Sequence, residues 1–175
     1  IAAGRPVGPD PTPFQLITKN VGRSVRDHDE YDPCCCTDGV CGDGCLNRAV
    51  LVECRDTPRC PSGNTCRNKR LQNGESAKVE VTYISATVGH GLITRQRIER
   101  GALIGEYNGE MLNEREYEQR RSRSTGHSYV IKMTDSRRCK FYLDAKKKGS
   151  QMRFANHSCQ PNAEFQKWSV EGYFR

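Results

Sequence analysis

The sequence has few apolar and aromatic residues and no long run of either. Hydrophobic residues make up 35% of the 175 positions and aromatic residues 7%, with one tryptophan. No stretch is long and apolar enough to form a transmembrane helix or the apolar part of a signal peptide, so we expect no membrane partner. The length is about that of one domain and is sufficient for a hydrophobic core.

Helical patterns are equally scarce, because one segment carries the clear helix signals. In residues 113–123, Asn113 can act as the N-cap and Glu116 as the third helical residue of a capping box, with arginines at the end. Short apolar or alternating runs predict strands or hairpin arms at 77–83, 102–107, 128–133, 141–144, 163–170 and 173–174. Many short strands with one helix predict a mostly-β fold.

Proline is concentrated at the start of the chain. Residues 1–13 contain four prolines and show no apolar periodicity, which predicts an arm or linker. The first apolar run, Phe14 to Ile17, is expected to dock on the body of the protein.

Cysteine, in contrast, is abundant. Ten cysteines are present, and eight of them lie close together in the first half of the chain: Cys34, Cys35, Cys36, Cys41, Cys45, Cys54, Cys60 and Cys66. A disulfide framework, as in small secreted proteins, is one interpretation. Adjacent cysteines such as Cys34 and Cys35 are difficult to bridge, no secretion signal is visible, and the remaining sequence can fold without cross-links.

Zinc is the interpretation that we favour for these cysteines. Tetrahedral thiolate sites suit short spacings such as that between Cys41 and Cys45, and each site takes four ligands. Two sites need eight thiolates, or seven if one thiolate bridges both ions. Few aliphatic residues accompany the cysteines, so we expect metal to replace a core and its binding to be coupled to folding.

The charge balance is basic. The formal net charge is +7 and the sequence pI is about 9.0, which favours an acidic partner such as nucleic acid or chromatin. Two zinc ions held by about seven thiolates would reduce the net charge to roughly +4, so this indication is modest.

The densest group of polar side chains lies near the end of the chain, in the ten-residue run 153–162, hereafter the signature loop. So many polar groups are unsuited to a core strand, because each would need a buried partner. The run is therefore either a capped turn around a buried Asn or a loop that binds a ligand. Upstream, glycines bracket His90, which indicates a turn or a close approach of the backbone to another group.

Taken together, these segments resemble the SET-domain lysine methyltransferases. The match extends from about Cys34 to the last residue and is carried by four motifs in order: Gly89-His90-Gly91-Leu92, Glu106-Tyr107-Asn108-Gly109-Glu110, Tyr129, and Arg153-Phe154-Ala155-Asn156-His157-Ser158-Cys159-Gln160-Pro161-Asn162. The cysteine cluster resembles the AWS region that precedes the catalytic domain in enzymes acting on lysine thirty-six of histone H3. Residues 166–170 are similar to the same branch.

The resemblance implies a fold and a domain order. We expect the SET-domain fold of short β-sheets with one helix, a mostly-β (β+α) class, preceded by a small cysteine-rich zinc-bound region. The expected divisions are an N-terminal arm or linker over 1–30, an AWS-like zinc-binding region over 31–74, and a SET domain over 75–175.

The resemblance also implies an activity. It predicts methyl transfer from S-adenosylmethionine to a lysine of histone H3, most specifically lysine thirty-six on nucleosomes, by a monomer in the nucleus on chromatin, with DNA contacts through the basic surface. Tyr129 would be catalytic, lining the lysine channel. The expected cofactor-binding residues are Val88, Gly89, His90, Leu92, His127, Ser128, Tyr129, Arg153, Asn156 and His157. Arg153 would either brace the signature loop or pair with the cofactor carboxylate.

The same resemblance assigns the cysteines. One zinc site would use Cys34, Cys36, Cys41 and Cys45, and a second would use Cys41 as a bridge with Cys54, Cys60 and Cys66. Cys35 is the spare thiol, although the three adjacent cysteines also allow a shifted register. Cys159 would be a ligand of a third zinc ion in a post-SET region.

The family pattern continues beyond the last hairpin. It adds a segment with a further tyrosine and the post-SET cysteines, neither of which this sequence contains, so we expect a C-terminally incomplete SET domain whose own activity is in question. Two other classes compete with the enzyme hypothesis. They are a non-catalytic zinc-containing module that binds chromatin and a secreted disulfide-rich protein.

Overall fold

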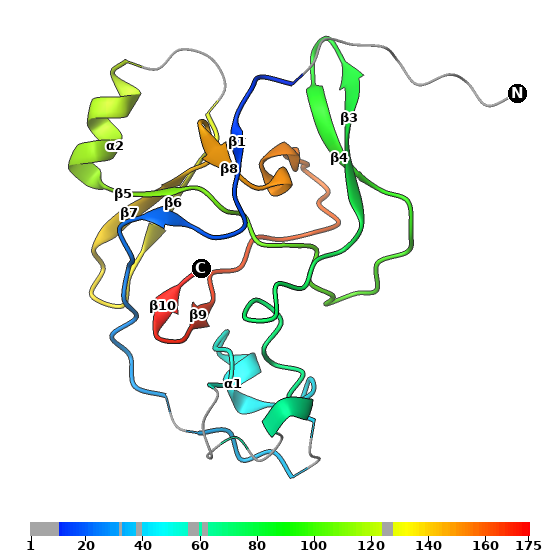
Figure 1. Cartoon of the computed structure of the whole chain (residues 1–175), viewed down its shortest axis with the longest axis vertical. Helices are drawn as coiled ribbons and strands as arrows, with labels where there is room; N and C mark the ends of the chain where they lie inside the picture. Colours follow the sequence, from blue (N-terminus) through cyan, green and yellow to red (C-terminus); the bar gives the residue numbers. More distant parts are fainter. Residues whose placement is uncertain (1–10, 32, 38–39, 56–59, 61–62, 124–127) are drawn as a thin grey trace, which may run out of the picture.

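The computed structural model describes residues 11–31, 33–37, 40–55, 60, 63–123 and 128–175. Strands predominate over helices in these residues, so the predicted mostly-β class is confirmed (Figure 1). The elements in order are β1 (Gln15–Leu16), β2 (Val21–Gly22), α1 (Leu46–Ala49), the 3-10 helix η1 (Gly63–Thr65), β3 (Val79–Ser85), β4 (Gly89–Thr94), β5 (Glu110–Asn113), α2 (Glu114–Arg121), β6 (Val130–Thr134), β7 (Lys140–Asp144), β8 (Lys148–Gly149), the 3-10 helix η2 (Gln151–Phe154), β9 (Ser169–Val170) and β10 (Tyr173–Phe174). None of the helices in the described part of the chain has the length and apolar character that crossing a membrane requires.

The largest sheet has four strands in the order β2-β5-β7-β6, and α2 packs beside β5 and β7. Strands β5 and β6 are both antiparallel to β7, while β2 is parallel to β5. The predicted capping box at the start of α2 is confirmed, because Asn113 Oδ1 accepts from Glu116 N at 2.9 Å and Glu116 Oε2 accepts from Asn113 N at 2.8 Å. The sheet buries a core of Met111, Phe141, Leu143 and Phe174.

A separate antiparallel pair, β3–β4, supplies one side of the predicted active site. The alternating run at 77–83 does form a strand, which begins at Val79 and extends to Ser85. Its register places Tyr83 opposite His90, and a turn at 86–88 connects the two strands. In Figure 1 this pair lies at the end of the molecule opposite the cysteine-rich region that contains α1.

The segment before the cysteines is part of the fold from Gln15 onward. Gln15 N donates to Lys147 O at 2.8 Å, and Ile17 N donates to Gly149 O at 2.9 Å, so β1 is parallel to β8. The predicted docking of the first apolar run is therefore confirmed. Figure 1 shows this segment (blue) beside β8 (orange) before it descends toward the cysteine-rich region.

The strand predicted at 102–107 is wrong, because this segment forms no strand in the structure. Its backbone groups bond to several different segments instead of to one neighbouring strand. Ile104 O accepts from Ala77 N at 2.9 Å, and Glu106 O accepts from the Ser150 hydroxyl at 2.7 Å.

The cysteine-rich region is attached to the last hairpin. The predicted hairpin arm at 163–170 shortens to β9, and the arm predicted at 173–174 forms β10. Glu53 N donates to Ser169 O at 2.9 Å. The buried Glu53 carboxylate accepts from the backbone N–H of Leu71 and, at 3.0 Å, from that of Gln72. These bonds hold the end of the cysteine cluster against the core around Trp168.

Candidate active site and metal centre

The signature loop begins as a buried anchor and continues as an exposed loop. Met152, Arg153 and Phe154 in η2 are buried, whereas every residue from 155 to 166 is exposed. A capped turn around a buried Asn is therefore excluded, since Asn156 is on the surface.

The exposed part of this loop meets β4 through a close contact. Asn156 Nδ2 donates to His90 O at 3.3 Å. A Cβ added to Gly91 would lie 3.0 Å from the same Nδ2 atom and 2.9 Å from Ile84 Cγ1, so only glycine fits without displacing a neighbour. Gly89 has a different role, because its φ of +74° supports the turn into β4.

Aromatic rings continue this contact below the surface. The Phe154 ring lies edge-on to His90 with 6.1 Å between centroids, and His90 lies edge-on to Tyr83 at 5.6 Å. Edge-to-face pairs at these separations stabilise packing beyond the apolar area that they bury. The rings therefore link η2 to the β3–β4 pair.

Tyr129 lies at the start of β6, where its backbone is fixed from two sides. Its carbonyl oxygen accepts from Tyr107 Oη at 2.9 Å and from Ala145 N at 3.0 Å. Burial raises the pKa of Tyr107 to about 12, so its phenol stays protonated and available as a donor. The ring of Phe165 packs edge-on against Tyr107 at 5.5 Å.

Arg153 occupies the centre of the site. Its side chain is 4% exposed, and none of its three guanidinium nitrogens has a hydrogen-bond partner among the described residues. Aromatic faces surround it instead, with centroids 3.9 Å from Cζ for Tyr129, 4.3 Å for Phe14 and 5.2 Å for Phe154. A desolvated guanidinium is held in this way by cation–π attraction.

The contacts connect several of the predicted cofactor residues. His90, Tyr129, Arg153 and Asn156 belong to one connected set, while Leu92 is half-buried on β4. The side chains of Val88, Ser128 and His157 are exposed, and His127 lies outside the described residues.

Several residues that contribute to the site were not assigned from the sequence, among them Phe14, Tyr107 and Phe165. Tyr107 could have been found, since it stands inside one of the quoted motifs. Phe14 stood out only as the start of an apolar run, and Phe165 carried no distinguishing signal.

The buried cysteines form two overlapping clusters. The sulfur atoms of each cluster lie within 4.8 Å of one another, and the clusters are Cys34, Cys41, Cys45, Cys54 and Cys41, Cys54, Cys60, Cys66. The second cluster has the predicted composition. In the first, Cys54 lies with Cys34, Cys41 and Cys45, and the predicted ligand Cys36 is partly buried and packs against the cysteine cluster. Cys35 is exposed.

The sulfur spacing fits zinc. Four thiolates at the usual zinc–sulfur distance of about 2.3 Å are about 3.8 Å apart at the corners of a tetrahedron. The sulfur atoms of Cys34 and Cys41 are 3.5 Å apart, those of Cys41 and Cys60 are 3.6 Å apart, and those of Cys45 and Cys54 are 3.8 Å apart. A disulfide needs about 2.0 Å, and all ten cysteines are free. The disulfide interpretation therefore does not describe this structure.

The surroundings of the sulfur atoms also suit a cation. Burial raises the pKa of the Cys66 thiol well above its ordinary range, so a thiolate at this position would need a cation beside it. The buried Asn68 amide donates to Val52 O at 2.8 Å and to Cys54 Sγ at 3.4 Å. Such donors orient metal ligands and support their charge. Cys159, in contrast, is exposed and belongs to neither cluster.

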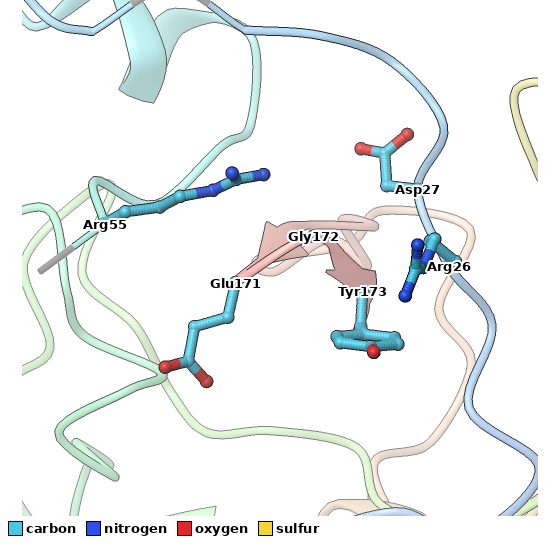
Figure 2. A pocket seen from close by; sticks show the side chains of 6 residues that line it. All are labelled: Arg26, Asp27, Arg55, Glu171, Gly172 and Tyr173. Atoms are coloured by element: carbon cyan, nitrogen blue, oxygen red, sulfur yellow. The ribbon is translucent and has the colours of Figure 1, made fainter. Parts of the chain in front are cut away.

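A separate pocket of about 230 Å³ lies where the N-terminal segment, the cysteine region and the last hairpin meet (Figure 2). Its lining residues are Arg26, Asp27, Arg55, Glu171, Gly172 and Tyr173. The Arg26 guanidinium lies 5.8 Å from the Tyr173 centroid, and Asp27 already accepts from Tyr31 Oη at 2.9 Å. None of the lining residues belongs to the signature loop or the cysteine clusters, so this pocket is distinct from the predicted site.

Comparison with known protein families agrees with this arrangement. Residues 32–73 match the AWS domain, and residues 89–175 match the SET domain. Histone-lysine N-methyltransferase ash1 of Drosophila melanogaster is 38% identical over 138 residues, which is 77% of this chain and 6% of that protein. Human histone-lysine N-methyltransferase SETD2 is 34% identical over 190 residues, 96% of this chain and 7% of that protein.

Two further matches complete the comparison. A human protein named histone-lysine N-methyltransferase, H3 lysine-36 specific, is 35% identical over 176 residues, 93% of this chain and 6% of that protein. The chain thus spans less than a tenth of the length of these three relatives. Among solved structures, the methyltransferase domain of human histone-lysine N-methyltransferase SETMAR superposes with a TM-score of 0.69 and 26% identity, covering 97% of this chain and 71% of that one.

The matches follow the order in which the structure places the parts, with the cysteine clusters first and the signature loop against β4 afterwards. The resemblance noted in the sequence is thereby confirmed. The chain belongs to the SET-domain family, in the branch that carries an AWS domain before its SET domain.

Proposed function

We propose that this chain transfers a methyl group from S-adenosylmethionine to the side-chain nitrogen of lysine thirty-six of histone H3. One observation carries the proposal: the signature loop and β4 are in direct contact through Asn156 and His90, with the Tyr129 ring connected to the same group of residues through Arg153. The names of the relatives support the histone substrate, and one of them specifies the same lysine.

Methyl transfer requires an uncharged lysine nitrogen that is aligned with the methyl group and the sulfur of the cofactor. A lysine with the reference pKa of about 10.4 must lose a proton, at a cost of about 4.6 kcal/mol at pH 7. A narrow apolar channel favours the neutral amine by desolvation, and the positive sulfonium that the cofactor supplies favours it by charge repulsion. No strong general base is then needed, and alignment of the reacting atoms supplies much of the remaining rate.

Different residues of the chain are proposed to position the lysine and to bind the cofactor. Tyr129 would line the channel and orient the amine with its hydroxyl, while Tyr107 and the Ala145 N–H keep the Tyr129 backbone in place. Asn156 and His157 would contact the cofactor, since both are exposed at the loop that meets β4. Val88, Gly89, Leu92, His127 and Ser128 would complete the cofactor site.

Arg153 is proposed to brace the loop. Its stacking on three rings favours this role over pairing with the cofactor carboxylate, because the guanidinium is covered by those rings.

Two zinc ions are proposed to hold the AWS region together. The seven candidate ligands are Cys34, Cys36, Cys41, Cys45, Cys54, Cys60 and Cys66. Zinc would supply no chemistry to the methyl transfer and would stabilise the fold, since thiolate sites of this kind are structural. Cys159 is proposed as a ligand of a third zinc ion in company with post-SET cysteines.

The partner is proposed to be the nucleosome, bound by a monomer in the nucleus. The net charge of +7 favours contact with DNA as well as with the histone tail.

The test uses this chain extended by the further tyrosine segment and the post-SET cysteines of the family pattern, with labelled S-adenosylmethionine and two kinds of nucleosome, one with unaltered histone H3 and one with arginine at position thirty-six. Label on the first and none on the second is expected, and Tyr129→Phe is expected to reduce labelling strongly. Binding to both nucleosomes without any label, and without dependence on the cofactor, would instead identify a non-catalytic chromatin-binding module.

A further inference from the structure

The N-terminal segment contributes a residue to the candidate active site. Phe14 lies outside both the AWS and the SET matches, yet its ring centroid is 4.3 Å from Arg153 Cζ. The same ring lies edge-on to Phe154 at 5.7 Å. The site is therefore built from a third part of the chain in addition to the two matched domains.

Strand pairing fixes the position of this ring. Phe14 directly precedes β1, which is parallel to β8, and β8 leads through Ser150 into η2, where Arg153 lies. The bonds from Gln15 N to Lys147 O and from Ile17 N to Gly149 O fix the start of β1, and with it Phe14, beside β8. Phe14 and Arg153 are thus kept together by backbone hydrogen bonds as well as by ring stacking.

The Arg153 guanidinium is held by its aromatic neighbours and by no hydrogen bond from the described part of the chain. Its Nε, Nη1 and Nη2 atoms lack hydrogen-bond partners among the described residues, although its side chain is buried. A guanidinium with unsatisfied donors moves toward water when its cover is removed. Phe14 and Tyr129 are the two closest of these rings, at 4.3 and 3.9 Å.

We propose that Phe14 is a positioning residue for Tyr129, acting through the guanidinium of Arg153. With Phe14 in place, Arg153 stays packed against the Tyr129 ring and limits its movement. Without an aromatic face at position 14, Arg153 turns toward solvent and Tyr129 samples additional orientations. The catalytic consequence rests on the proposed methyl transfer, whereas the positioning itself does not.

The experiment compares three variants in the whole chain. Phe14→Leu keeps an apolar side chain and removes the aromatic face, while Phe14→Tyr keeps the face. Leu16→Ala changes the same segment at an exposed side chain and serves as the control. Each protein is labelled with ring-¹³C tyrosine, and the resonance lost in Tyr129→Phe identifies Tyr129. The Tyr117 resonance is the internal reference, because that ring stacks on Tyr142 with 4.0 Å between centroids.

We expect Phe14→Leu to shift or broaden the Tyr129 resonance and leave Tyr117 unchanged. Where methyl transfer is measured, we expect kcat to fall about three- to tenfold in Phe14→Leu, as loss of a partly desolvated cation–π contact implies, with KM for the cofactor unaltered. Phe14→Tyr is expected to keep the Tyr129 resonance and kcat of the unaltered chain, and Leu16→Ala is expected to change neither.

The outcomes separate this inference from the proposed function. A Tyr129 resonance that is the same in Phe14→Leu and in the unaltered chain overturns the inference, whether or not the chain is active. A shifted resonance with an unaltered kcat overturns the catalytic consequence. A chain extended by the further tyrosine segment and the post-SET cysteines that binds nucleosomes but transfers no methyl group overturns the proposed function, whereas the Tyr129 resonance still tests the positioning.

Discussion

Replacing Gly91 with alanine is expected to weaken cofactor binding more than it weakens the fold. The added methyl group would lie 2.9 Å from Ile84 Cγ1 and 3.0 Å from Asn156 Nδ2, where ordinary contacts begin near 3.4 Å. Ile84 is 38% exposed and can turn outward at little cost. The Asn156 amide must retreat by about 0.4 Å, which takes its 3.3 Å bond to His90 O beyond hydrogen-bond range.

The magnitude follows from that bond. A lost hydrogen bond of this kind costs about 0.5–1.5 kcal/mol, which is about a two- to thirteenfold loss of affinity if the bond orients Asn156 for the cofactor. The measurement is titration calorimetry with S-adenosylmethionine, combined with urea unfolding of the same protein.

Gly101→Ala is the matched control. Gly101 has a φ of +78° and an added Cβ would meet nothing within 4 Å, so the change introduces backbone strain without a clash. It is expected to lower the free energy of unfolding by about 1–2 kcal/mol and leave cofactor affinity unaltered. If Gly91→Ala binds the cofactor as the unaltered chain does, the contact between the signature loop and β4 does not form the cofactor site.

Three further predictions concern stability and the site. Cys54 belongs to both cysteine clusters, so Cys54→Ser is expected to reduce bound zinc from two ions per chain to less than one, whereas Cys35→Ser is expected to retain both ions. Elemental analysis measures the zinc content, and equal content in the two variants would contradict the shared role of Cys54. Tyr107→Phe removes the bond to the Tyr129 carbonyl and is expected to lower kcat with little change in melting temperature, while a selective rise in KM would refute this. The hydrogen bond from Arg120 lowers the pKa of Glu110, so this pair stabilises the fold at pH values above the ordinary pKa of a glutamate, and the stabilisation is lost as pH falls through the lowered folded-state pKa. Arg120→Met is expected to make the free energy of unfolding less dependent on pH in this acidic range. An unchanged dependence on pH would argue against the pair.

Local signals predicted the features that depend on neighbouring residues. The capping box of α2 requires only Asn113 and Glu116 three positions later, and both hydrogen bonds are present. The alternation that predicts β3 reflects one half-buried strand, and its position was correct within two residues. Motif order was sufficient to identify the family, because the signature loop is long and specific.

Features that depend on distant residues were not predicted. The apolar run at 102–107 reads as a strand, but hydrogen bonds to Ala77 and Ser150 occupy its carbonyl groups. Cysteine spacing could not show that Cys54 belongs to the first cluster as well as to the second, because this depends on how the loops fold back. Phe14 joins the site through a parallel pairing with residues more than a hundred positions away, which no local pattern encodes.

The most direct test of the central claim is mass spectrometry of histone H3 from nucleosomes incubated with S-adenosylmethionine and this chain, extended by the further tyrosine segment and the post-SET cysteines of the family pattern. Methyl groups at lysine thirty-six, absent after reaction with Tyr129→Phe, are the predicted result. Histone H3 without added methyl groups, from a folded chain that binds both zinc and the cofactor, would contradict the account.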